Sequence, residues 1–142
     1  MHISYMTCET PTPEQLAEVD RILDEFNHTD GPIDEVRRLC VFAKGEGDTV
    51  VGGAVGRTWG ECCELQQLSV EASHRGRRVG ANLMEQFEAE ARARGCRLVY
   101  LDTLSFQAPE FYKKCGYHVA HEMRGFTHGV IKYTMHKSLF AA

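Results

Sequence analysis

The sequence predicts an α/β fold (mixed α+β), in which helices flank a central, mostly antiparallel sheet of six to seven strands with one parallel pair. Short apolar runs separated by close turns in residues 39–70 predict antiparallel strands. A strand–helix–strand unit over residues 64–104 predicts the parallel pair, because parallel strands need a crossover connection. The chain has 142 residues, the size of one ordinary domain, so we expect a single domain over residues 1–142.

The first expected element is a helix that begins at Pro13. Thr12 is a good N-cap, and Gln15 three residues later completes a capping box. Apolar residues then recur at helical spacing, namely Leu16, Val19, Ile22, Leu23 and Phe26. The polar, turn-rich segment 27–32 predicts the end of this helix, and a short second helix is expected over residues 34–38.

Three strands are expected next, over residues 39–43, 50–55 and 64–70. The turn at residues 45–48 separates the first two, and Trp59-Gly60 separates the second from the third. The adjacent glycines at 52 and 53 suggest a β-bulge in the second strand. The close turns favour an antiparallel meander.

The second half of the chain alternates helices and strands. A helix over residues 80–94 has apolar residues on one face and is stopped by Gly95. A buried strand is expected at 97–104, followed by a short helix at 108–114 that ends before Gly116. Two further strands are expected at 118–123 and 130–136.

Composition narrows the class of protein. The net charge of −4 gives no indication of nucleic-acid binding, and no apolar run reaches the roughly 18 residues of a membrane helix. The N-terminus has no signal-peptide pattern, so a cytoplasmic protein is expected. The six cysteines are interpreted mainly as reduced, structural residues, with disulfides or zinc as the alternative. No metal site is expected, since His118 and His121 fall on opposite faces of a strand.

The most informative segment is the loop between the third strand and the long helix. It runs Arg75, Gly76, Arg77, Arg78, Val79, Gly80 and Ala81. The first N–H groups of a helix lack internal partners, and the helix dipole adds positive charge there. Three arginines add full charges, so the loop predicts a binding site for a pyrophosphate. The alternative is a solvated basic turn.

Two motifs resemble those of the GNAT superfamily of N-acyltransferases. The loop resembles the family's pyrophosphate motif, Q/R-x-x-G-x-G/A, with Arg75 first and Gly80 last, although Arg78 stands where the family usually has glycine. Residues 108–117, APEFYKKCGY, are similar to the family segment A-x-x-F-Y-x-K-x-G-F/Y. Ser105 stands where the family often has an asparagine that contacts pantetheine.

The resemblance implies an acetyltransferase that moves an acetyl group from acetyl-CoA to a primary amine by direct attack in a ternary complex. It implies a splayed pair of parallel strands that exposes the edge formed by Leu68, Ser69 and Val70 to pantetheine. Ser105 would be a further cofactor contact. Two alternatives stay open: a non-catalytic CoA-binding or regulatory domain of this fold, and a phosphate- or nucleotide-binding module.

The resemblance also suggests the two catalytic residues. Tyr112 would protonate the leaving thiolate, although without the resemblance aromatic packing beside Phe111 is the favoured explanation. Glu64 would accept the amine proton, with a solvated carboxylate, or a water chain in its place, as alternatives. The expected acceptor is a small molecule rather than a protein, and family members are often homodimers. The acceptor's identity and the use of other acyl groups stay open.

Overall fold

The computed structural model describes residues 1–140, which form two units: residues 1–35 and the chain from Val36 onward. The first unit contains helix α1 (Pro13–Asp30) and a 3-10 turn (Ile33–Glu35). The capping box is confirmed, since the Gln15 N–H donates to Thr12 Oγ1 at 3.1 Å and the Thr12 N–H donates to Gln15 Oε1 at 2.9 Å.

Two predicted boundaries in this region are wrong. Helix α1 continues through the polar residues 27–30, and Gly31 closes it by donating its N–H to the Asn27 carbonyl at 3.0 Å. In place of the short helix expected at 34–38 there is a single 3-10 turn that ends at Glu35, and strand β1 (Arg37–Lys44) begins inside the range expected to be helical. Pairing of Arg37 with Thr58 on the next strand decides the extended conformation there, which local propensity does not reveal.

The second unit contains the six-stranded sheet, which confirms the predicted fold class. Its other strands are β2 (Val50–Trp59), β3 (Cys62–Val70), β4 (Leu98–Leu104), β5 (His118–Met123) and β6 (Lys132–Ser138). The order is β1-β2-β3-β4-β6-β5, and β3 and β4 form the parallel pair among antiparallel neighbours. The crossover between β3 and β4 is helix α2 (Val79–Ala93).

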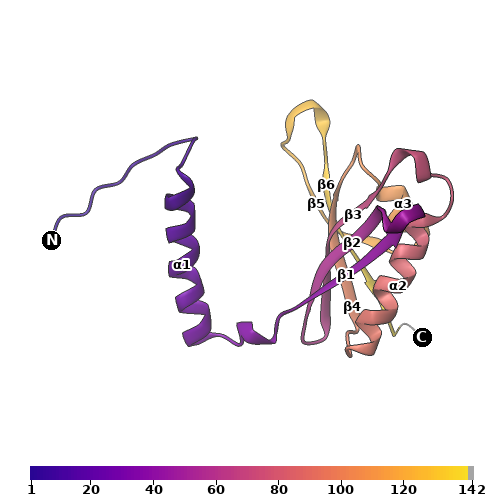
Figure 1. The fold of residues 1–142 in the computed structure, drawn as a ribbon. Coiled ribbons are helices and arrows are strands. Elements are labelled where there is room, and N and C mark those ends of the chain that lie inside the picture. The colour runs from indigo at the N-terminus through magenta and orange to yellow at the C-terminus, as the bar shows by residue number, and fades with distance from the viewer. Residues whose placement is uncertain (141–142) are drawn as a thin grey trace. The chain divides into compact units, whose positions relative to one another are not determined.

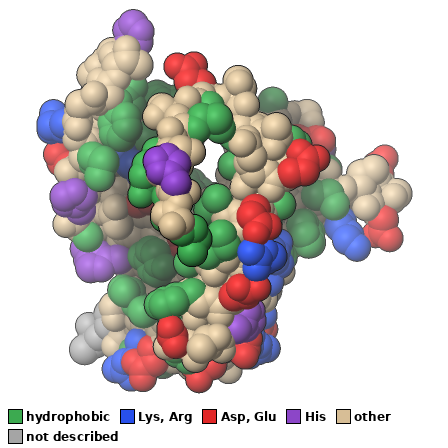
Figure 2. Space-filling view, turned by 90° about the vertical axis from the view of Figure 1, so that its left-hand side faces the viewer, with side chains coloured by type: hydrophobic (Ala, Val, Ile, Leu, Met, Phe, Trp, Pro, Cys, Tyr) green, Lys and Arg blue, Asp and Glu red, His purple; other side chains and the backbone are tan. Residues whose placement is uncertain are grey.

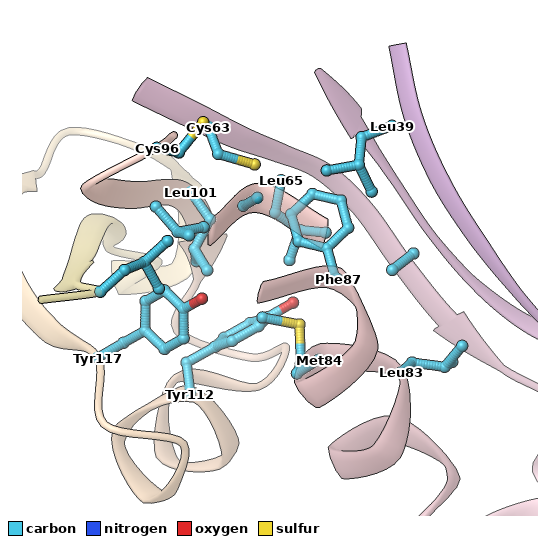
Figure 3. Packing of buried hydrophobic residues seen from close by; sticks show 14 of the residues in the cluster. Leu39, Cys63, Leu65, Leu83, Met84, Phe87, Cys96, Leu101, Tyr112 and Tyr117 are labelled. Atoms are coloured by element: carbon cyan, nitrogen blue, oxygen red, sulfur yellow. The ribbon is translucent and has the colours of Figure 1, made fainter. Parts of the chain in front are cut away.

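Helix α2 and the short helix α3 (Pro109–Lys114) lie on the same side of the sheet (Figure 1). Phe87 and Met84 of α2 are fully buried against β1 to β4, where they meet Leu39, Leu65 and Leu101 (Figure 3). Gly56 of β2 permits this close approach, because a Cβ atom there would lie 2.8 Å from the Phe87 ring. This packing fixes α2 on the sheet, and it therefore also fixes the position of the loop that precedes α2.

A β-bulge interrupts the pairing of β2 with β3. The register shifts between Val55 and Gly56, which face Gln67 and Leu65, so Gln66 is the extra residue of β3. The second strand also carries a bulge in its pairing with β1, where Val51 is the extra residue, directly before the position predicted at Gly52–Gly53. Because Gln66 is inserted in β3, Leu68 and Val70 after it pack against the core, as Cys63 and Leu65 do before it.

The surface carries charges of both signs (Figure 2), and the cysteines are unpaired. Among the described side chains on the face in Figure 2, basic and acidic groups are interspersed. All six cysteines are free thiols; Cys63 and Cys96 are buried as expected, whereas Cys8, Cys40 and Cys62 are exposed. Within residues 1–140, no helix has both the length and the apolar character needed to cross a membrane.

Candidate active site

The parallel strands β3 and β4 diverge halfway along their length. Their pairing ends at Leu65 and Leu101, yet β3 stays paired to β2 as far as Val70 and β4 stays paired to β6 as far as Leu104. The bulge at Gln66 lies directly after the last parallel pair. The edge of β3 that faces β4 is therefore unpaired over residues 66–70, and an amide-containing ligand can add to such an edge as a further strand would.

A cavity of about 1090 Å³ opens where the two strands part. Its walls are residues 65–70 of β3, residues 74–76 and 78–81 of the loop and α2, residues 101–103 of β4, and residues 107, 108, 111, 112 and 114 around α3. The structure thus brings together nine of the expected binding residues: Leu68, Ser69, Val70, Arg75, Gly76, Arg78, Val79, Gly80 and Ala81. Arg77 and Ser105 do not line the cavity.

The start of helix α2 forms the cationic end of the cavity. The first helical hydrogen bond runs from the Asn82 N–H to the Arg78 carbonyl at 2.9 Å, so the N–H groups of Val79, Gly80 and Ala81 precede it. Arg75 and Arg78 supply side-chain charge beside them, and Arg75 Nε donates to the Val70 carbonyl at 3.3 Å. These groups suit the two negative charges of a pyrophosphate.

Two backbone positions explain why glycine is common in this motif. Arg78 has φ = 62°, the left-handed region in which a side chain costs about 1–2 kcal/mol and glycine costs little. A Cβ atom at Gly80 would lie 3.3 Å from the Phe111 ring, so a side chain there would require this ring to shift slightly, and glycine lets α2 and α3 approach without that shift. Arg78 therefore keeps the loop conformation of the glycine motif at the cost of backbone strain.

Tyr112 of α3 lies at the wall of the cavity. This residue is 8% exposed and its ring packs edge-on against that of Tyr117 (Figure 3), with ring centroids at 6.0 Å. It also packs edge-on against Phe111, with ring centroids at 5.2 Å. Burial raises the pKa of Tyr112 to about 12, so the phenol stays protonated at neutral pH. No hydrogen-bond partner for its hydroxyl occurs within residues 1–140, and the oxygen is not sealed from solvent. The hydroxyl is therefore free to donate a proton.

Glu64 lies outside the cavity wall. It precedes Leu65 on β3, and because neighbouring strand residues point to opposite faces, it faces away from α2. Its carboxylate accepts a hydrogen bond from Arg57 Nε at 2.9 Å, and its partner in the parallel register is Tyr100. The side chain is 27% exposed. A proton would thus reach Glu64 from the cavity through an intermediary such as water.

Ser105 does not line the cavity, and Gln107, two residues further along the chain, does. The Ile131 N–H donates to Ser105 Oγ at 3.0 Å, which ties the end of β4 to the β5–β6 connection. Gln107 lines the cavity instead, and its Oε1 accepts from the Leu104 N–H at 2.8 Å. That bond leaves the Gln107 amide N–H groups for a ligand. The sequence signal for this residue was a polar side chain directly before the Ala108 motif.

A second residue that the sequence analysis missed is Asp102 of β4. It lines the cavity one residue beyond the last parallel pair. Its signal was a charged residue within the apolar run RLVYLDTL, at the carboxyl end of a strand in a parallel pair, where ligands commonly bind.

Comparisons with known proteins agree with this geometry. The family model described as Acetyltransferase (GNAT) family matches residues 4–117. The chain is 34% identical over 112 residues to a blasticidin-S acetyltransferase from Streptomyces morookaense, covering 76% of this chain and 82% of that protein. An acetyltransferase structure from Bacillus cereus superposes with a TM-score of 0.73 at 26% identity, over 94% of this chain and 97% of that one.

A third comparison concerns the cofactor. A structure from Bacillus anthracis that contains acetyl coenzyme A superposes with a TM-score of 0.64 at 18% identity, over 71% of this chain and 62% of that one. At this identity the similarity shows the fold alone.

Proposed function

The chain belongs to the GNAT acetyltransferase family and is an acetyl-CoA-dependent N-acetyltransferase, and we propose that it acetylates a small-molecule amine by direct attack in a ternary complex. The single observation that supports direct attack is the divergence of β3 and β4 beyond Leu65 and Leu101, which leaves one continuous cavity between a cationic end and the edge of β3. Donor and acceptor can meet there without a covalent enzyme intermediate. Family membership also accounts for the phosphate loop, so neither alternative function is needed.

The residues of this cavity fit acetyl-CoA. The N–H groups at the start of α2, with Arg75 and Arg78, would hold the pyrophosphate. The free edge at residues 66–70 would pair with the amides of pantetheine, and Gln107 would donate a further hydrogen bond. The acetyl group would then lie near Leu68, whose N–H could polarise its carbonyl.

The chemistry assigns one proton transfer to each of two residues. The neutral amine nitrogen attacks the thioester carbon, a C–N bond forms, and the C–S bond breaks. Tyr112 gives its proton to the leaving sulfur, and Glu64 takes the amine proton, relayed through water because the carboxylate lies outside the cavity. Before the next cycle Glu64 releases its proton to solvent and Tyr112 takes one up from solvent. The products are an N-acetyl amide and free CoA.

The small-molecule acceptor is supported by the relative that acts on blasticidin S. The test is a panel of primary amines that includes blasticidin S, with lysine peptides as the protein-like members, assayed with acetyl-CoA by release of free thiol. We expect turnover of small amines above that of peptides, with an amide product of one added acetyl group by mass spectrometry. Turnover of peptides alone would contradict the proposed acceptor class, whereas thiol release without acetylated product would contradict N-acetyl transfer.

A further inference from the structure

The charges that line the cavity are separated along its length. Cationic side chains, Arg75, Arg78 and Lys114, gather where α2 begins and α3 ends. Asp102 is the carboxylate among the described residues that line the cavity, and it lies on β4 next to the point where the strands part. A cavity built for a single anion would have no use for a carboxylate at its other end, because the negative charge repels that ligand.

The Asp102 carboxylate is oriented but only partly satisfied. Thr134 Oγ1 donates to its Oδ1 at 2.6 Å, which fixes the side chain against β6. Its Oδ2 lies 3.7 Å from Lys132 Nζ, and both side chains are half-exposed, so this ion pair contributes little. Oδ2 therefore retains capacity to accept a hydrogen bond from a ligand.

We infer that Asp102 binds a second group of the acceptor that is positively charged at neutral pH, so that the natural substrate class is amines carrying another ammonium or guanidinium. The inference rests on the proposed acetyl transfer. The reacting amine itself must be neutral to attack, and a carboxylate beside it would stabilise its unreactive ammonium form. Asp102 is thus better suited to a group that stays charged throughout, while the reacting nitrogen lies toward β3. The nearby side-chain amides of Gln66 and Gln67 add polar contacts without charge.

The test compares matched pairs of primary amines of similar length, for example 1,5-diaminopentane against pentylamine and 4-guanidinobutylamine against hexylamine. Within each pair, the member with a second cationic group is called charged and the member without it is called neutral. In the wild type we expect higher kcat/KM for the charged member of each pair. Asp102→Asn should lower kcat/KM for charged members by about tenfold or more, the loss expected of a charge-assisted hydrogen bond. Neutral members should change less than twofold, and the KM for acetyl-CoA should not change.

Asp48→Asn is the matched control, since Asp48 lies in an exposed turn outside the cavity and asparagine tolerates its left-handed backbone. Equal losses for charged and neutral amines in Asp102→Asn, or a wild-type preference for neutral members, would overturn the inference. The inference would also be overturned if the enzyme acetylated other amines but none of the charged ones. Failure of the wild type to bind acetyl-CoA, or to acetylate any amine, would instead remove the proposed function.

Discussion

The phenolic hydroxyl of Tyr117 donates a hydrogen bond of 2.9 Å to the Glu88 carboxylate inside the core. The other carboxylate oxygen meets Lys137 Nζ at 2.8 Å, and that ammonium also donates to the Cys115 carbonyl at 2.8 Å. Burial, together with the Glu88 charge, raises the pKa of Tyr117. The group links α2, whose start forms the phosphate site, to the end of α3, which holds Tyr112.

We expect Tyr117→Phe to destabilise the protein because it removes this bond from a buried carboxylate. The loss of unfolding free energy should be about 1.5–3 kcal/mol, the range for hydrogen bonds to charged groups. Urea denaturation measures it. Tyr5→Phe is the control, since Tyr5 is exposed and should change stability by less than about 0.5 kcal/mol. Equal stability of the two variants would show that the bond contributes nothing net.

The loop arginines should contribute unequally to CoA affinity. Arg75→Ala should weaken CoA binding about 10- to 100-fold, because it removes a charge at the cavity wall. Arg77→Ala, predicted from the sequence to matter equally, should have the smaller effect, since Arg77 does not line the cavity. Calorimetric titration with CoA compares the two. A larger loss for Arg77 than for Arg75 would contradict this assignment.

Arg78→Gly should leave the fold intact and raise the unfolding midpoint slightly. Glycine relieves the left-handed strain at φ = 62°, although the exposed contact of Arg78 with Glu85 at 3.3 Å is lost. CoA affinity should fall less than in Arg75→Ala, because the backbone N–H groups remain. Arg78→Val is the matched contrast, since a β-branched residue is strongly disfavoured in this region. If both variants melt alike, the backbone conformation at residue 78 carries no strain.

Glu64→Gln tests the proton acceptor. If Glu64 accepts the amine proton, the variant should lose turnover at neutral pH and should also lose the acidic limb of the pH–rate profile, because glutamine does not titrate. Arg57→Met, which removes the partner of Glu64 but keeps the carboxylate, should retain an acidic limb. Rates over pH 5–9 with saturating acetyl-CoA measure both. An unchanged profile in Glu64→Gln would assign the proton to solvent.

Tyr112→Phe separates a catalytic tyrosine from a packing one. The variant loses one hydroxyl and little volume, so CoA affinity should stay near the wild-type value. Turnover should fall by roughly 100-fold or more, the usual effect of a positioned acid. Tyr133→Phe is the control for the chemical change itself, since Tyr133 lies on β6 and does not line the cavity. Equal turnover in the wild type and Tyr112→Phe would remove Tyr112 from the mechanism.

The raised pKa of Tyr112 also predicts how stability depends on alkaline pH. Its pKa is about 12 in the folded protein, above the value of about 10 expected when unfolded. The folded state therefore holds the proton more tightly, and stability should fall as pH rises from about 10 to about 12. Tyr112→Phe should make this fall shallower. Urea midpoints of both proteins at pH 8 and pH 11 give the comparison, and identical falls would show that Tyr112 does not titrate differently on folding.

The sequence by itself determined the fold class, the capping box at Thr12 and Gln15, and the loop from Arg75 to Ala81. Each depends on residues that are close in the chain: cap and first turn, alternating runs with their turns, and a loop followed by its helix. The two motifs also sufficed to indicate the GNAT family. Of the binding residues that these local patterns predicted, all but Arg77 and Ser105 line the cavity, and their role in binding stays a prediction.

Only the tertiary structure decided what depends on distant residues. The bulge at Gln66 and the end of pairing at Leu65 depend on how β3 meets β2 on one edge and β4 on the other, which no local pattern records. For the same reason the sequence could not show that Arg57 pairs with Glu64. Nor could it show that Gln107 and Asp102 reach the cavity, since a side chain's access to a site depends on which strands part and where.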